Sequence, residues 1–349
     1  MRKMMVVMLA MLIALALVLP VWARGEGEAA PAAEAAAPGE GPVNVRFGSM
    51  PVGSSWYVYA ATISSLLEGT LPPGSSVEVI PQGGGIANPL TVELNNAEVA
   101  LANVATSNWA FQGIEMYEGR QAPNIRALVG GLNKVFAVVI FSDDYIRRTG
   151  IDTVEELFAQ KARARLVTKP EGSTAPPVAR MIMEHHGVTI ADIESWGGSF
   201  TQVTGGQIPG VMRDGQADVW FDVIPPGHPA VTEAMTTTDL TIVSLSDDTI
   251  AALNQYGLAR DVISANTWPK QPNAVNTVNP GTVIIAHADL PEHVAYEITK
   301  AICENKPVLL EAHASIEPFV PEDGWRPENT GIPLHPGAER YYRERGWMQ

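Results

Sequence analysis

Short apolar strands alternate with helical patterns in the first hundred residues after position 42. The segment Val43–Phe47 alternates apolar and polar residues and ends at Gly48, which predicts a first strand. Two further strands are predicted over Val77–Ile80 and Val99–Val104, and a helical pattern follows each of the three strands. This order of strand, loop and helix predicts a mostly parallel sheet with helices on both faces.

The same alternation continues beyond a β-rich stretch over Ile125–Phe141, which the pair Gly130–Gly131 divides. This stretch is where we expect the chain to cross into a second lobe, and Leu240–Leu245 is where we expect it to return. The pattern predicts an α/β protein of two lobes joined by a hinge of two or three strands. The first lobe is predicted to span 43–138 and 246–349, and the second 139–245.

The N-terminal segment has the pattern of a secretory signal peptide. A basic start precedes an apolar run over Met4–Val21, and Val21-Trp-Ala23 has the small–x–small form of a cleavage site. The run is also long enough for a membrane anchor, but Pro20 and the cleavage pattern favour removal of residues 1–23. Residues 24–42 are almost wholly Ala, Pro, Glu and Gly, which predicts a flexible linker. We therefore expect a free periplasmic protein.

Charge and cysteine content exclude several classes of partner and site. The chain carries a net charge of −15, which repels nucleic acids and anionic membrane surfaces. Its only cysteine, Cys303, lies in an amphipathic pattern, and we expect a buried thiol. The sequence contains no Gly-x-Ser-x-Gly, Ser-x-x-Lys, His-Glu-x-x-His or phosphate-loop motif. We therefore expect no enzyme, no bound metal and no cofactor.

Three glycine-containing loops with hydroxyl or amide side chains precede predicted helices: Gly53–Tyr57, Gly83–Asn88 and Gly172–Thr174. Helix N-termini expose unpaired N–H groups and a partial positive charge, and glycine permits close approach of a ligand. Each loop alone is explained by a helix cap or a turn. Three of them, in two lobes, favour a site for an anion in the cleft.

The candidate ligand-binding residues come from these loops and the strands beside them. Lys169 is included as a basic residue close to the presumed cleft, and Trp220 as either a core residue or a ligand contact. The full set is Ser54, Ser55, Trp56, Tyr57, Gly84, Gly85, Asn88, Ser107, Lys169, Gly172, Ser173, Thr174, Trp220 and Asp222. Removing the polar groups of Ser54 or Asn88 is expected to weaken binding.

The C-terminal run from Gly331 to Gly346, Gly-Ile-Pro-Leu-His-Pro-Gly-Ala-Glu-Arg-Tyr-Tyr-Arg-Glu-Arg-Gly, resembles the signature of the TAXI family, the substrate receptors of TRAP transporters. The segment Gly48–Tyr57 is similar to the family's glycine- and tyrosine-rich first loop, and Asp214–Asp218 resembles a family turn. The other two loops resemble Gly-Gly-Ser-x-x-Asn and Gly-Ser-Gly, with departures at Gly85 and Thr174. The segment Ala105–Trp109 also departs from the family pattern.

This resemblance implies a periplasmic-binding-protein-like fold of type II and capture of a small organic acid between the lobes. Family ligands are dicarboxylates, 2-oxo acids or glutamate-like amino acids, and the implied partner is a TRAP-type membrane permease. The departures leave the particular ligand open. One alternative is a ligand-sensing module that docks on a membrane kinase. The other is a periplasmic enzyme on the same scaffold, which turnover of a bound ligand would reveal.

Overall fold

The computed structural model describes residues 41–81 and 83–349. The predicted signal peptide and nearly all of the predicted linker lie outside the described residues. Five strands form the sheet of the first lobe in the order β2-β1-β3-β12-β4. β1 pairs in parallel with β2 and β3, whereas β12 runs antiparallel to β3 and β4. The strands are β1 (Asn44–Gly48), β2 (Ser76–Ile80), β3 (Val99–Ala102), β4 (Ile125–Gly130) and β12 (Val283–His287).

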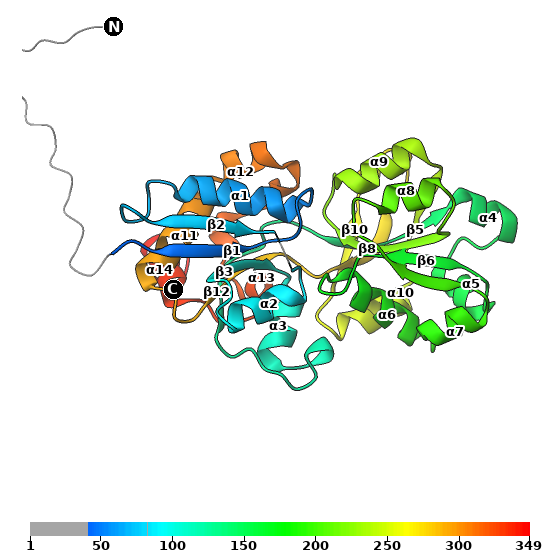
Figure 1. Cartoon of the computed structure of the whole chain (residues 1–349), viewed down its shortest axis with the longest axis horizontal. Helices are drawn as coiled ribbons and strands as arrows, with labels where there is room; N and C mark the ends of the chain where they lie inside the picture. Colours follow the sequence, from blue (N-terminus) through cyan, green and yellow to red (C-terminus); the bar gives the residue numbers. More distant parts are fainter. Residues whose placement is uncertain (1–40, 82) are drawn as a thin grey trace, which may run out of the picture. The chain divides into compact units, whose positions relative to one another are not determined.

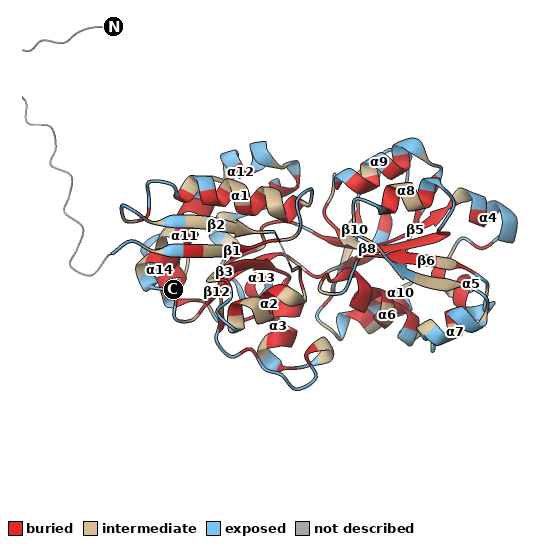
Figure 2. Cartoon of the chain, viewed as in Figure 1, coloured by how far each residue is buried: buried red, intermediate tan, exposed pale blue. Residues whose placement is uncertain are grey.

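Helices cover both faces of this sheet (Figure 1). One apolar cluster joins the sheet to α1 (Ser55–Leu67), α11 (Glu292–Glu304), α12 (Lys306–Ala312) and α14 (Pro336–Glu344). The opposite face packs against α2 (Ala87–Glu93) and α3 (Val104–Gln112). β3 is buried at every position because it lies inside the sheet between these two layers, as Figure 2 shows.

The second lobe repeats this plan with the strand order β7-β6-β8-β5-β9. β6 pairs in parallel with β7 and β8, and β5 is antiparallel to β8 and β9. The strands are β5 (Phe136–Ser142), β6 (Arg165–Thr168), β7 (Ser199–Gln202), β8 (Val219–Ile224) and β9 (Leu240–Val243). α8 (Ile208–Arg213) and α9 (Pro229–Thr237) pack on one face. α5 (Val154–Ala159), α6 (Ala175–His185), α7 (Ile190–Ser195) and α10 (Asp247–Asn254) pack on the other.

The limits of the second lobe differ from those expected. The predicted boundary after residue 138 falls inside β5, and β9 is an edge strand of the second sheet rather than the return crossing. An antiparallel ribbon, β10 (Ala259–Ile263) with β11 (Val275–Asn279), then packs on this lobe. Its residues Ile263 and Val275 share one apolar cluster with Trp220. The second lobe of the structure therefore runs from β5 to β11, because the ribbon buries its apolar side chains there.

Two short segments, 131–135 and 280–282, connect the lobes and lie side by side. The Leu132 N–H donates to the Thr282 carbonyl over 3.3 Å, and the Val135 N–H donates to Asn279 Oδ1 over 3.3 Å. Lys134 adds an ion pair with Asp261 at 2.8 Å. The first contact joins the two connecting segments, and the other two fix the first segment to the β10–β11 ribbon of the second lobe.

The C-terminal run, Gly331–Gly346, packs against other elements of the first lobe. His335 caps α14 by accepting a hydrogen bond from the Gly337 N–H, and a Cβ at Gly337 would lie 2.1 Å from the Glu292 carbonyl of α11. The Tyr342 hydroxyl donates to the Leu128 carbonyl of β4 over 3.2 Å. The run therefore seats the last helix against α11 and β4, and none of its residues lines the pocket described below.

The expectation of a buried thiol at Cys303 is confirmed, since its side chain lies in the first-lobe core and burial raises its pKa to about 12. Within the described residues, we find no helix with the length and apolar character that a membrane crossing requires.

Candidate ligand-binding site

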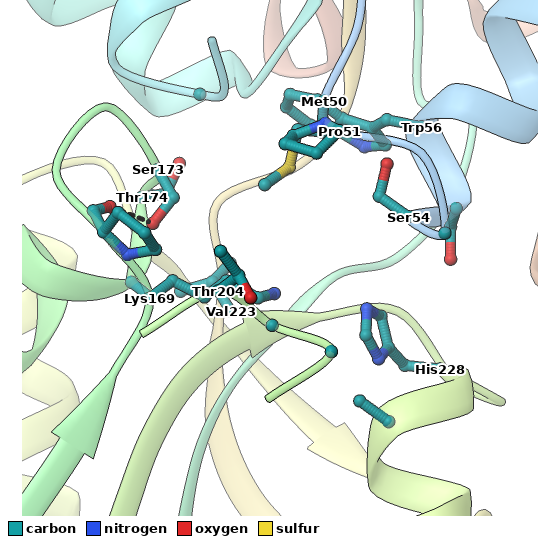
Figure 3. A pocket seen from close by; sticks show the side chains of 18 of the residues that line it. Met50, Pro51, Ser54, Trp56, Lys169, Ser173, Thr174, Thr204, Val223 and His228 are labelled. Carbon is teal, nitrogen blue, oxygen red and sulfur yellow. Dashed lines mark hydrogen bonds between the residues drawn. The ribbon is translucent and has the colours of Figure 1, made fainter. Parts of the chain in front are cut away.

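A pocket of about 610 Å³ lies between the two lobes. The first lobe contributes the loop from Met50 to Trp56, and the second contributes segments around Lys169–Ala175, Thr204–Gly206 and Val223–Glu233. Figure 3 shows Ser54 and Trp56 on one side of the pocket, with Lys169, Thr204 and His228 on the other. A ligand held here therefore contacts both lobes.

The N-termini of three helices meet at this pocket. Ser54 caps α1 and accepts a hydrogen bond from the Tyr57 N–H over 3.1 Å, while Thr174 precedes α6 and His228 precedes α9. Prolines occupy the first turns of α6 and α9 and remove N–H donors there. The first N–H groups of α1 have no intrahelical acceptor. The α1 terminus therefore offers the fuller set of backbone donors, and all three termini contribute positive potential.

A buried ion pair lies at the second-lobe side of the pocket. Lys169 Nζ lies 2.7 Å from Asp222 Oδ1, with the two side chains 8% and 0% exposed. Asp222 also accepts hydrogen bonds from the Trp220 indole at 3.1 Å and the Val223 N–H at 2.7 Å. Burial raises the pKa of Asp222, and Lys169 opposes this rise by favouring the carboxylate. Asp222 therefore positions the Lys169 ammonium at the pocket without lining the pocket itself.

His228 was not among the predicted site residues. Its side chain is buried and lines the pocket, and its Nδ1 makes no hydrogen bond within the described part of the chain. Burial, the Lys169 charge and His313 all lower the pKa of His228, so the ring is neutral near pH 7. The sequence did contain a signal for this role, because His228 lies in the loop Pro-Pro-Gly-His-Pro between a strand and a helix.

Two of the three predicted loops bind each other at the edge of the pocket, which Gly83, Gly85, Ser173 and Thr174 of these loops also line. The Gly172 carbonyl of the second lobe accepts hydrogen bonds from the Ile86 and Ala87 N–H groups, at 3.0 and 3.1 Å. Beside them, Thr174 Oγ1 donates to Asn103 Oδ1 over 2.5 Å. We call this contact between Gly84–Ala87 and Gly172–Thr174 the interlobe clasp. The Gly172 carbonyl therefore occupies the N-terminus of α2, where the sequence predicted an anionic ligand.

Glycine is required in the clasp for steric reasons. A Cβ at Gly84 would lie 2.7 Å from the Gly172 carbonyl oxygen, and the Gly84 φ of +148° disfavours other residues. A Cβ at Gly85 would lie 1.9 Å from Thr174 Oγ1. The two positions that depart from the TAXI-like pattern, Gly85 and Thr174, thus face each other across the clasp.

The predicted residues separate into two groups. Those that line the pocket are Ser54, Ser55, Trp56, Gly85, Lys169, Ser173 and Thr174. Those that do not are Tyr57, Gly84, Asn88, Ser107, Gly172, Trp220 and Asp222. Asn88 is buried, and its amide nitrogen donates to the carbonyls of Ser49 and Leu101. Trp220 and Ser107 are fully buried, Trp220 in the second-lobe core and Ser107 in α3.

Apolar residues form much of the remaining wall. Met50, Val135, Val223 and Ala230 line the pocket beside Trp56. Ser55 also lines it, and its buried hydroxyl makes no hydrogen bond within the described residues. Across positions 41–81 and 83–349, no three His, Cys, Asp or Glu side chains gather as metal ligands would. The site thus combines apolar contact with a few directed polar groups, as small-molecule sites commonly do.

Comparison with known proteins identifies the family and supports the fold. A model of the NMT1-like family matches residues 47–346, and the chain belongs to this family. The structure of a protein from Bordetella bronchiseptica RB50 is similar over 87% of this chain and 98% of that chain, with 14% sequence identity and a TM-score of 0.53. This similarity confirms the two-lobe α/β fold.

Two further solved structures resemble the chain more weakly. The alkanesulfonate-binding protein SsuA from Xanthomonas axonopodis pv. citri, bound to MOPS, has 11% identity and a TM-score of 0.43, covering 86% of this chain and 84% of that chain. A TctC solute-binding protein from Polaromonas has 15% identity and a TM-score of 0.45, covering 78% of this chain and 86% of that chain.

Proposed function

We propose that the chain is a periplasmic receptor that captures a small organic acid between its lobes and delivers it to a TRAP-type membrane permease. The observation that carries this proposal is the interlobe pocket, where three helix N-termini meet beside the Lys169 ammonium. Backbone donors, helix dipoles and an ammonium all stabilise a carboxylate. Membership of the NMT1-like family and the two-lobe fold support a binding role.

Contacts from both lobes explain how ligand capture would be signalled. Ser54 and Trp56 belong to the first lobe, whereas Lys169 and His228 belong to the second. A ligand that touches both groups stabilises the arrangement in which the lobes are close, through its higher affinity for that arrangement. The permease would then recognise the ligand-bound form. The TAXI-like C-terminal run and loop order are what favour a TRAP-type permease as the partner.

A binding screen tests the proposal. The chain is produced with its own N-terminal segment and purified from the periplasm, so that the mature N-terminus shows whether cleavage follows Ala23. Thermal unfolding is then measured with carboxylates, neutral sugars and amines. A carboxylate at about 1,000 times its dissociation constant should raise the free energy of unfolding by about 4 kcal/mol.

Two matched variants locate the binding. Thr204 is an exposed residue that faces the pocket, so Thr204→Trp should fill the pocket and abolish the carboxylate shift. Thr236 is exposed on α9 and does not line the pocket, so Thr236→Trp should retain the shift. Stabilisation by sugars or amines alone would contradict the proposal.

A further inference from the structure

We infer that the ligand of this pocket is a monoanion with an apolar body, rather than a dicarboxylate or a glutamate-like acid. This inference rests on the proposed function, because it concerns the same pocket and presumes that a carboxylate binds there. It follows from the charges that surround the pocket and from the composition of its wall.

The positive charge of the pocket is small and already partly compensated. Among the described residues that line it, Lys169 is the one Lys or Arg side chain. Its ammonium is paired with the fully buried Asp222 carboxylate at 2.7 Å, so the pair carries no net charge. One of the three ammonium N–H groups is directed at Asp222, which leaves two for a ligand. The pair therefore provides directed donors for one carboxylate without surplus charge for a second.

The other ionisable groups at the pocket oppose a second negative charge. His228 is neutral near pH 7 because burial and Lys169 lower its pKa. Two glutamates also line the pocket, Glu171 and Glu233. Glu171 is paired with Arg180 at 2.9 Å, whereas Glu233 is exposed and has no basic side chain within 4.0 Å in the described part of the chain. A second carboxylate would be repelled by Glu233 and would find no cation to balance it.

Apolar side chains from both lobes also line the pocket and suit an apolar body. Met50, Pro51, Trp56, Val135, Val223 and Ala230 line the pocket with carbon or sulfur surface. Burial of a methylene group against such a wall strengthens binding by about fourfold. A second carboxylate placed against these side chains would instead lose its hydration without gaining hydrogen bonds from them. Charge and wall composition thus favour the same class of ligand.

Titration calorimetry on the mature protein with two matched acid series tests the inference. The monocarboxylates are butyrate, hexanoate and octanoate, and the dicarboxylates are succinate, adipate and suberate, with glutamate and 2-oxoglutarate added. Hexanoate is expected to bind at least about tenfold more tightly than adipate, and affinity should rise with chain length until the pocket is filled. Equal or tighter binding of adipate, glutamate or 2-oxoglutarate would overturn the inference and leave the proposed function intact.

A charge variant sharpens this test. Glu233→Gln removes the unpaired acidic group at the pocket, so adipate should gain several-fold in affinity while hexanoate changes little. Asp152→Asn is the matched control, because Asp152 is an exposed acid of the same lobe that does not line the pocket. Equal gains for adipate in both variants would overturn the assigned role of Glu233. Absence of binding by every acid in both series would overturn the proposed function together with the inference.

Discussion

The two contact regions between the lobes use the same kind of loop for opposite purposes. In the interlobe clasp, the N–H groups of Ile86 and Ala87 are already bonded to the Gly172 carbonyl. At the pocket, the N-terminus of α1 meets no such acceptor, and His228 Nδ1 and Ser55 Oγ have no partner among the described residues. One loop pair therefore holds the lobes together, whereas the N-terminus of α1 offers its backbone donors at the pocket.

This difference shows that a glycine-rich loop before a helix can bind either a ligand or another segment of the chain. Only the segment that lies next to it in the fold decides between the two. Such a loop binds whichever acceptor approaches it, and a backbone carbonyl serves as well as a carboxylate. The absence of a side chain at Gly84 and Gly85 lets the second lobe approach closely enough to supply that carbonyl. Four predictions test the contrast between clasp and pocket.

The largest effect is expected at the buried ion pair beside the pocket. Asp222→Leu removes the counter-charge of Lys169, whose side chain is 8% exposed, and should lower the free energy of unfolding by about 3–5 kcal/mol. Urea denaturation measures this loss. The double variant Lys169→Met with Asp222→Leu should recover much of it, because neither charge is then buried alone. No recovery in the double variant would show that the pair is not the cause.

The clasp is tested by adding one methyl group. Gly84→Ala places a Cβ against the Gly172 carbonyl at a φ of +148°, which should cost about 1–3 kcal/mol. Hydrogen exchange should accelerate at the Ile86 and Ala87 amides, which the clasp protects. Gly69→Ala is the control, since Gly69 also has a positive φ but has open space around it. Unchanged exchange in the Gly84 variant would contradict the clasp.

Ser54 and Asn88 were expected from the sequence to contribute alike to binding, and the structure separates them. Ser54→Ala removes the cap of α1 and should cost about 1 kcal/mol in stability and weaken binding of a carboxylate. Asn88→Ala should lower stability without a specific effect on affinity, because Asn88 bonds Ser49 and Leu101 and does not line the pocket. Calorimetry of both variants distinguishes these outcomes.

The smallest effect concerns pH. The folded-state pKa of His228 lies below its ordinary value of 6.5, so the unfolded chain takes up a proton there first as pH falls. The stability contributed by the neutral ring is present above pH 6.5 and is lost as pH falls towards the folded-state pKa. Between pH 7 and pH 6 this loss is about 0.7 kcal/mol.

His228→Gln should reduce this loss, as measured by urea unfolding at each pH. Some pH dependence should remain, because the pKa values of His186, His313 and His335 are also lowered. An unchanged difference between pH 7 and pH 6 in the variant would argue against a neutral, buried His228.

Local patterns in the sequence were sufficient to predict β1, β2 and β3 of the first sheet and the helix that begins after Ser54, which caps it. The predicted strand Val77–Ile80 differs from β2 by one residue at its start. Such features depend on contacts within a few residues, which periodicity and capping side chains report directly. The β10–β11 ribbon was not predicted because its strands carry many polar residues. Its packing on β5 and Trp220 is what assigns it to the second lobe.

Tertiary structure alone decided which predicted groups remain available to a ligand. Nothing near Gly84 in the sequence indicates that Gly172 will occupy the adjoining N–H groups, and nothing near Lys169 indicates its pairing with Asp222. His228 becomes a pocket residue for the same reason, because α9 brings it opposite Ser54. The sequence by itself determined the donors and charges of this protein. Contacts between segments far apart in the chain determined which of them are already satisfied and which face the pocket.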